Sequence, residues 1–160
     1  MAANGQGRRR PSPGTRRPRP AERRLPSLRA RRLGFVFQDF NLLSALTALE
    51  NVELACNLAG LAGRAAHQRA HALLERVGLT HRLGFRPEQL SGGEKPRVAI
   101  ARALANDPPV ILADEPTANL DSAIGRQVAR LLRQLATADG RAVVIVSHDS
   151  RLEEIADRVL

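Results

Sequence analysis

The pattern of apolar and polar positions predicts three short strands in this chain of 160 residues. Each predicted strand is a short run of apolar residues that is followed by polar residues. The runs lie within Leu33–Gln38, Val110–Ala113 and Ala142–Val146. Short uncharged runs of this kind are typical of strands buried inside a parallel sheet.

Between these runs, apolar positions recur at helical spacing. One helix is expected to begin at Thr47, which has capping-box spacing with Glu50. A second, Arg64–Gly78, stops at a glycine suited to the position after a helix. Two more are expected, one after Asp121 and one near Asp149. The order of elements predicts an α/β core with parallel strands and an inserted helical portion.

The first 27 residues differ from the rest in composition. They combine arginine and proline with few apolar residues, a mixture that cannot offset chain entropy by burial and predicts a disordered tail. Residues 1–32 hold eleven arginines and one acidic residue, whereas residues 33–160 hold 14 basic and 15 acidic residues. The net charge of +9 therefore belongs to the start of the chain. Three interpretations stay open: a tether for nucleic acid or acidic lipid, a solvated tail, or an out-of-frame start in an arginine-rich coding region.

Composition also excludes several kinds of site. The single cysteine, Cys56, cannot form an internal disulfide or a multi-cysteine metal site, and a buried thiol is expected. Three histidines on or beside an amphipathic helix, His67, His71 and His81, are expected at the surface. No apolar run exceeds five residues, whereas a membrane span needs about 20. The chain itself is expected to be soluble.

A glycine-rich turn opens the stretch "LSGGEKPRVAIARAL". Ser91 and Glu94 have capping-box spacing, and Gly92 and Gly93 would let a ligand approach the backbone. Free N–H groups and the positive end of the helix dipole make such a terminus an anion site. Taken alone, this stretch could also be an ordinary capped helix that binds no anion.

Polar side chains follow the three predicted strands. Asp114 and Glu115 are adjacent, so they point in opposite directions: one can hold Mg²⁺ while the other activates a water. His148 ends the strand expected beside that of Asp114, and Gln38 ends the first run. All four can reach the sheet edge where α/β proteins bind ligands. The alternatives are an acidic loop cap and a structural histidine.

Four motifs in this order, "GFVFQ", "LSGGE", "VILADEPTANLD" and "VIVSHD", resemble those of the nucleotide-binding subunit of ABC transporters. The resemblance covers about residues 28–160. The wording around the first motif is most similar to the ATP-binding subunits of the lipoprotein-releasing and macrolide-export group. It implies an ABC-type ATPase that uses ATP and Mg²⁺.

The resemblance also implies a role for each matching residue. Glu115 would be the general base, Asp114 would orient Mg²⁺, and Gln38 would contact Mg²⁺ or the attacking water. His148 would be the switch histidine at the γ-phosphate, and Asp121 would sit at a dimer interface. The signature, Ser91, Gly92, Gly93 and Glu94, would close on the γ-phosphate of ATP held by the other protomer.

The implied fold is a partial P-loop NTPase core, with a RecA-like parallel sheet and the ABC α-helical subdomain. Residues 28–160 would form a partial nucleotide-binding domain, with the helical subdomain at about 41–105 and the C-terminal part of the core at 106–160. The implied partners are a membrane-spanning permease subunit and a second nucleotide-binding subunit, identical or different. The location would be the cytoplasmic face of the membrane, reached through the permease, and nucleic acid is not an expected partner.

The chain departs from the family pattern at the phosphate-binding loop. The motif G-x-x-x-x-G-K-[ST] is absent, and Lys95 is the only lysine. The chain also lacks Tyr and Trp, so no such aromatic can stack on adenine, and the sheet is expected to be short at both ends. We expect no measurable ATP hydrolysis by the chain alone, because positioning and charge supply most of phosphoryl-transfer catalysis. A non-catalytic accessory or nucleic-acid-associated fragment is the alternative function.

Lys95 and Pro96 stand where the family has helix-forming residues. Proline removes one backbone bond within a helix. The sequence therefore predicts that this helix starts late, with Pro96 near its first position. Pro96→Gln would then tighten any engagement of ATP held by another chain.

Overall fold

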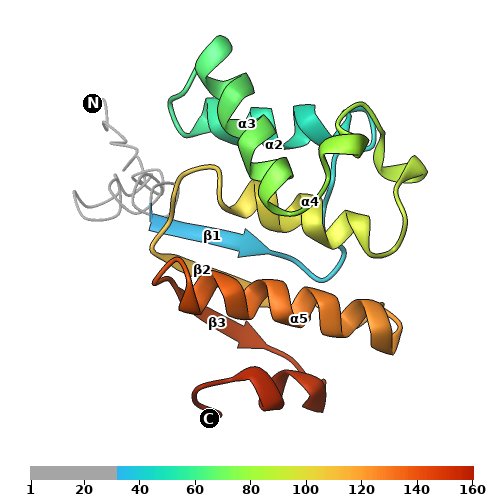
Figure 1. The fold of residues 1–160 in the computed structure, drawn as a ribbon, viewed down its shortest axis with the longest axis vertical. Coiled ribbons are helices and arrows are strands. Elements are labelled where there is room, and N and C mark those ends of the chain that lie inside the picture. Colours follow the sequence, from blue (N-terminus) through green and yellow to red (C-terminus); the bar gives the residue numbers. More distant parts are fainter. Residues whose placement is uncertain (1–31) are drawn as a thin grey trace, which may run out of the picture.

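Three parallel strands form the sheet of the computed structural model, which describes residues 32–160 (Figure 1). They are β1 (Leu33–Val36), β2 (Val110–Asp114) and β3 (Ala142–Val146), and β2 lies between the other two. The parallel α/β prediction is confirmed, although β1 ends two residues before Gln38. The predicted tail, residues 1–27, lies outside the described residues.

The two faces of the sheet differ in burial. On one face, Val36 and Ala113 are paired in register and buried, as is Ile111. On the opposite face, Phe35 is partly exposed and Val144 is 52% exposed. The prediction that the Ala142–Val146 run is a buried strand is therefore wrong for the described residues. The reason is its place at the edge of the sheet, where β2 is its only partner strand among them.

Two helices follow β1, and local sequence explains both. Helix α2 (Ala48–Leu58) begins at the predicted capping box, where the Thr47 N–H donates to Glu50 at 2.8 Å and the Glu50 N–H donates back at 3.2 Å. Helix α3 (Arg64–Arg76) ends before Gly78, whose φ of 75° glycine adopts without strain. Two short 3₁₀ helices, η1 (Thr80–Arg82) and η2 (Pro87–Gln89), lead to the signature.

Helix α4 (Glu94–Ala103) begins earlier than the sequence predicts. Pro96 is its third residue, whereas we predicted it near the first. The amide groups of the first turn have no partner inside a helix, so the missing N–H of Pro96 is tolerated there. Only half of the predicted capping box forms: the Ser91 N–H donates to the Glu94 carboxylate at 2.8 Å, but the Glu94 N–H donates to the Ser91 carbonyl oxygen at 3.1 Å, and the helix cap is Gly93.

The remaining helices begin where expected. Helix α5 (Ser122–Thr137) is capped by the Asp121 carboxylate, which accepts from two backbone N–H groups at 2.9 and 3.0 Å. The last helix is a 3₁₀ helix, η3 (Ser150–Ile155), capped by Asp149.

The helices form two groups around the sheet (Figure 1). Helices α2, α3 and α4 pack on one another and α4 packs on β1, while α5 packs on β3 and η3. Gly34 permits the close approach of α4, since a Cβ there would lie 2.5 Å from the Ala103 carbonyl oxygen. Cys56 is buried in the core as expected, and burial raises the pKa of its thiol.

An ionic network ties α3 to the amino ends of β2 and β3. Arg76 of α3 donates to Asp139 at 2.5 Å. Arg141, just before β3, donates to Asp107 at 2.6 Å and also to the Pro108 carbonyl. These bonds fix the group formed by α2, α3 and α4 against the amino ends of the strands, at the end of β2 opposite to Asp114.

Candidate functional site

The carboxyl ends of β2 and β3 bring the predicted acidic and histidine residues together. Asp114 is the register partner of Val146, so Glu115 lies beside the segment that follows β3. The Glu115 N–H donates to the Val146 carbonyl at 2.8 Å, and Glu115 has a left-handed φ of 44°. The chain therefore turns sharply at Glu115, and the side chain is directed toward the end of β3.

Both oxygens of the Glu115 carboxylate are held by residues after β3. The Ser147 hydroxyl donates to one oxygen at 2.7 Å, and the His148 backbone N–H donates to the other at 3.0 Å. The Glu115 side chain is only 18% exposed. A carboxylate held at both oxygens is fixed in orientation while it keeps lone pairs for a water molecule.

His148 follows β3 as predicted. Its ring is fully exposed, and Nε2 lies 3.8 Å from Glu115 Oε1, an ion-pair distance if the ring is protonated. The Asp114 side chain is also exposed and makes no hydrogen bond or ion pair within the described part of the chain. These two side chains are free to meet a ligand at the sheet edge.

A second layer of contacts connects the loops after β2 and β3. Buried Thr117 donates to Asp149 at 2.6 Å, and the Arg151 guanidinium donates to the same carboxylate at 2.7 Å. The Asp149 N–H donates to Ser147 Oγ at 3.1 Å, which joins this layer to Glu115. The hydrogen bond from Arg151 holds the pKa of Asp149 well below its usual range.

The sequence reasoning did not assign a role to Ser147, Thr117 or Arg151. Thr117 contacts Asp149 and Ser147 contacts Glu115, and in each pair the two residues are 32 positions apart in the chain. A pattern of neighbouring residues therefore does not indicate either contact. Only Asp149 gave a local signal, as the expected start of the last helix.

The signature lies at the start of α4 and beside α5. Glu94 accepts from the Ser91 N–H and from Arg82 Nε, both at 2.8 Å, and the first of these bonds is the main cause of its lowered pKa. A Cβ on Gly93 would lie 3.1 Å from Ile124 of α5, so this glycine permits close packing. Gly92 is exposed and has open space around it.

A pocket of about 280 Å³ adjoins the signature. Ser91, Gly93 and Glu94 form one side, and Ile124 and Gln127 of α5 form another. Asp121 caps the same helix one turn earlier. The structure thus brings Asp121 and the signature to neighbouring helix starts, while no hydrogen bond or ion pair joins the signature to Glu115 within residues 32–160.

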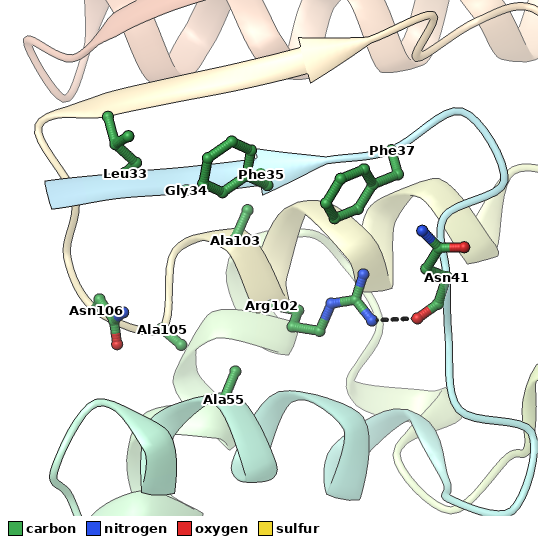
Figure 2. Close-up of a pocket in the computed structure, with 10 residues that line it drawn as sticks. All are labelled: Leu33, Gly34, Phe35, Phe37, Asn41, Ala55, Arg102, Ala103, Ala105 and Asn106. Atoms are coloured by element: carbon green, nitrogen blue, oxygen red, sulfur yellow. Dashed lines mark hydrogen bonds between the residues drawn. The ribbon is translucent and has the colours of Figure 1, made fainter. Parts of the chain in front are cut away.

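Gln38 is exposed in the turn after β1. This turn is held by α4, because Arg102 donates to the carbonyl oxygens of Phe40 and Asn41 at 2.6 and 2.5 Å. Figure 2 shows Arg102 reaching Asn41 beneath Phe37 in a pocket of about 370 Å³ between β1, α2 and α4. Burial lowers the pKa of Arg102. No hydrogen bond or ion pair joins Gln38 to Glu115 among the described residues, and the contact of Gln38 with Mg²⁺ or the attacking water stays a prediction.

The described residues contain no cluster of three or more His, Cys, Asp or Glu side chains placed to hold a metal ion. Within the same range, no helix is long and apolar enough to cross a membrane.

Comparison with known proteins identifies relatives. A protein-family model described as ABC transporter matches residues 7–118. An uncharacterized ABC transporter ATP-binding protein of Thermotoga maritima is 56% identical over 128 residues, which cover 80% of this chain and 54% of that protein. The macrolide export ATP-binding/permease protein MacB of Rhodospirillum rubrum is 52% identical over 136 residues, which cover 85% of this chain and 21% of that protein.

A solved structure is similar in both sequence and fold. The dimeric ATP-binding cassette MJ0796, bound to ADP and Pi, matches with a TM-score of 0.73 and 44% sequence identity over 85% of this chain and 60% of that chain. The chain therefore has the fold of an ATP-binding cassette. It spans 54% of the Thermotoga maritima protein, 21% of MacB and 60% of MJ0796.

Proposed function

The chain belongs to the ABC transporter family, and we propose that it acts in the ATP-binding subunit of an exporter, where ATP binding and hydrolysis move a substrate across or out of a membrane. The observation that carries this proposal is the junction of β2 and β3, where both oxygens of Glu115 are held in place. A base that is oriented before the reaction loses little freedom in the transition state.

In this proposal, Glu115 accepts a proton from the water that attacks the terminal phosphoryl group. Its two hydrogen-bond donors orient the carboxylate, and the exposed ring of His148 is placed to contact the phosphate beside it. Gln38, which is exposed in the turn after β1, would contact the water or the metal.

The residues present fit Mg²⁺ bound together with a nucleotide. Magnesium in nucleotide sites takes one or two carboxylates and completes its shell with water and phosphate oxygens. Asp114 supplies one such carboxylate, exposed and without a competing bond among the described residues. When bound, the ion neutralises phosphate charge, and Asp114 orients it.

For ATP itself, this chain supplies an anion site at the signature. The Gly92 and Gly93 amides make no hydrogen bond within residues 32–160, and Gly92 is open to solvent. Because the sequence has no phosphate-binding loop, we propose that the signature closes on ATP held by a second subunit, with Asp121 at that interface. Ser91 and Glu94 shape the turn that presents these amides.

The proposed partners follow from this arrangement. A second ATP-binding subunit would provide the phosphate-binding loop, in keeping with the dimers formed by MJ0796. A membrane-spanning permease would use the hydrolysis, in keeping with a relative whose name joins ATP-binding and permease functions. The chain would then act at the cytoplasmic face of the membrane through that permease.

Steady-state ATP hydrolysis by the full chain alone tests the proposal. We expect no turnover above background, because Lys95 is the only lysine and no glycine-rich loop surrounds the β- and γ-phosphates. Turnover that is present in the wild-type chain and lost in Glu115→Gln would contradict the requirement for a second subunit.

A further inference from the structure

The signature contains a carboxylate close to the amides proposed to receive a phosphate. Glu94 is the first residue of α4, and its side chain is only 16% exposed. Its Oε2 accepts from the Ser91 N–H at 2.8 Å, so the negative charge lies against the residue next to Gly92. A carboxylate suits the start of a helix, but it repels an incoming phosphate. A signature that binds ATP therefore needs this charge to be compensated.

Arg82 of η1 supplies a compensating charge. Its Nε donates to Glu94 Oε1 at 2.8 Å, while the Ser91 N–H occupies the other oxygen. The pKa of Glu94 is lowered by the Ser91 hydrogen bond first and by Arg82 as well. Glu94 is therefore ionised at neutral pH, and the guanidinium of Arg82 pairs with a full negative charge.

Packing restrains the Arg82 side chain. Its guanidinium carbon lies 4.6 Å from the centre of the Phe85 ring, a cation–π distance. The Phe85 carbonyl oxygen accepts from the Ala48 N–H at 2.8 Å, which anchors this segment to the start of α2. An arginine restrained in this way loses less freedom on pairing than a free surface side chain does, which favours the ion pair.

One other basic side chain comes within ion-pair distance of Glu94 among residues 32–160. His81 Nε2 lies 3.9 Å from Oε1, and the His81 side chain is 65% exposed. Lys95 and Arg97, which follow Glu94 in α4, form no ion pair with it in the same range. An imidazole is positive only when it is protonated, so Arg82 is the permanent cation at this carboxylate.

We propose that Arg82 is a positioning residue of the signature: it neutralises and holds Glu94, so that the Gly92 and Gly93 amides can bind a phosphate of ATP. Without Arg82, an unpaired carboxylate would lie beside that phosphate. This inference rests on the proposed function of the signature, and it holds whichever chain carries the nucleotide.

The test mixes the full chain with an MJ0796 cassette made defective in its signature and follows ATP hydrolysis at about pH 8, where a free imidazole is mostly neutral. Arg82→Met keeps an apolar stem over Phe85 but removes the charge. We expect the ATP concentration at half-maximal rate to rise at least about threefold, with little change in the maximal rate, because the repulsion opposes binding. Salt at about 0.5 M should remove most of this difference by screening.

Three further variants separate charge from structure. Glu94→Gln in the Arg82→Met background should restore the wild-type half-maximal concentration, because it removes the unpaired charge while its amide oxygen still accepts from the Ser91 N–H. A merely structural role of Arg82 would not be rescued in this way. Arg82→Lys keeps the charge and should stay close to the wild type. Arg64→Met, at an exposed α3 position without an ion pair among the described residues, should have no effect.

Failure of this inference and failure of the proposed function give different results. No increase in rate with the wild-type chain would overturn both. An increase with an unchanged half-maximal ATP concentration in Arg82→Met, or a change that Glu94→Gln does not reverse, would overturn the role of Arg82 alone. Circular dichroism checks that each variant is folded. If Arg82→Met is not folded, Arg82→Gln, which keeps a donor without the charge, takes its place with the same expectation.

Discussion

The Ser147 hydroxyl donates a 2.7 Å hydrogen bond to the carboxylate of Glu115, across the junction of two strands. Ser147 in turn accepts from the Asp149 N–H, and Asp149 binds Thr117, two residues after Glu115. These hydrogen bonds thus form one network that joins the loop after β2 to the loop after β3. Ser147 lies at the carboxyl ends of the strands and orients Glu115, the proposed base, through this hydrogen bond.

Removing the hydroxyl in Ser147→Ala should weaken this junction. Glu115 loses a charge-assisted bond at a mostly buried carboxylate, which should lower the free energy of unfolding by about 1–2 kcal/mol. Urea denaturation followed by circular dichroism measures this change. Ser150→Ala, at an exposed position three residues later, should leave the midpoint unchanged, and an equal loss in both variants would mean that the bond to Glu115 is not the cause.

Acid should destabilise the protein partly through Asp149. Its pKa is lowered in the folded state by the Arg151 hydrogen bond, so this carboxylate contributes stability above its unfolded pKa of about 3.9. That contribution is lost as the pH falls below about 4 toward the lower folded pKa. The drop in urea midpoint between pH 6 and pH 3 should therefore be larger for the wild type than for Asp149→Asn.

Asp149→Asn should also be less stable than the wild type at pH 7, because Arg151 loses a charged partner. Equal pH dependence in the two proteins would show that Asp149 is not tied to Arg151 in solution.

Arg141→Met should loosen the helical group from the sheet. Arg141 is mostly buried and donates to Asp107, Asp139 and the Pro108 carbonyl. Loss of these bonds should lower the free energy of unfolding by about 1–3 kcal/mol. Arg130→Met changes an exposed arginine of α5 and is the control. The expected result is a clear shift in thermal midpoint for Arg141→Met and almost none for Arg130→Met.

The start of α4 at Glu94 revises the expectation for Pro96. Since Pro96 lies in the first helical turn, its missing N–H costs nothing there. Pro96→Ala should leave any engagement of ATP in trans unchanged and should only reduce stability, through lost packing of a buried ring and a freer unfolded chain. A tighter engagement of ATP would instead support the original prediction from sequence.

Local signals in the sequence predicted the features of this fold that depend on near neighbours. The Thr47 and Glu50 box and the stop at Gly78 follow from short patterns, and the adjacency of β2 and β3 follows from the order strand, helix, strand. The contact of Ser147 with Glu115 could not be predicted in this way, because it depends on the turn at Glu115 and on strand register. The exposure of β3 depends on which strands flank it, and an apolar run by itself does not specify its neighbours.

The central claim is that the signature of this chain acts on ATP held by another subunit. The MJ0796 cassette forms a dimer bound to ADP and Pi, so a copy of it made defective in its signature can supply the nucleotide that this chain would contact. Gly92→Asp is the decisive variant: a Cβ at Gly92 would meet no atom within 4 Å, so we expect the fold to be preserved while the carboxylate repels phosphate. Gly84→Asp, at another open glycine, is the matched control.

The measurement is the rate of ATP hydrolysis when the defective cassette is mixed with the full chain. The proposal predicts that the wild-type chain and Gly84→Asp raise the rate of the mixture above that of either component alone, and that Gly92→Asp does not. No increase with the wild-type chain, or an increase that persists with Gly92→Asp, would contradict it.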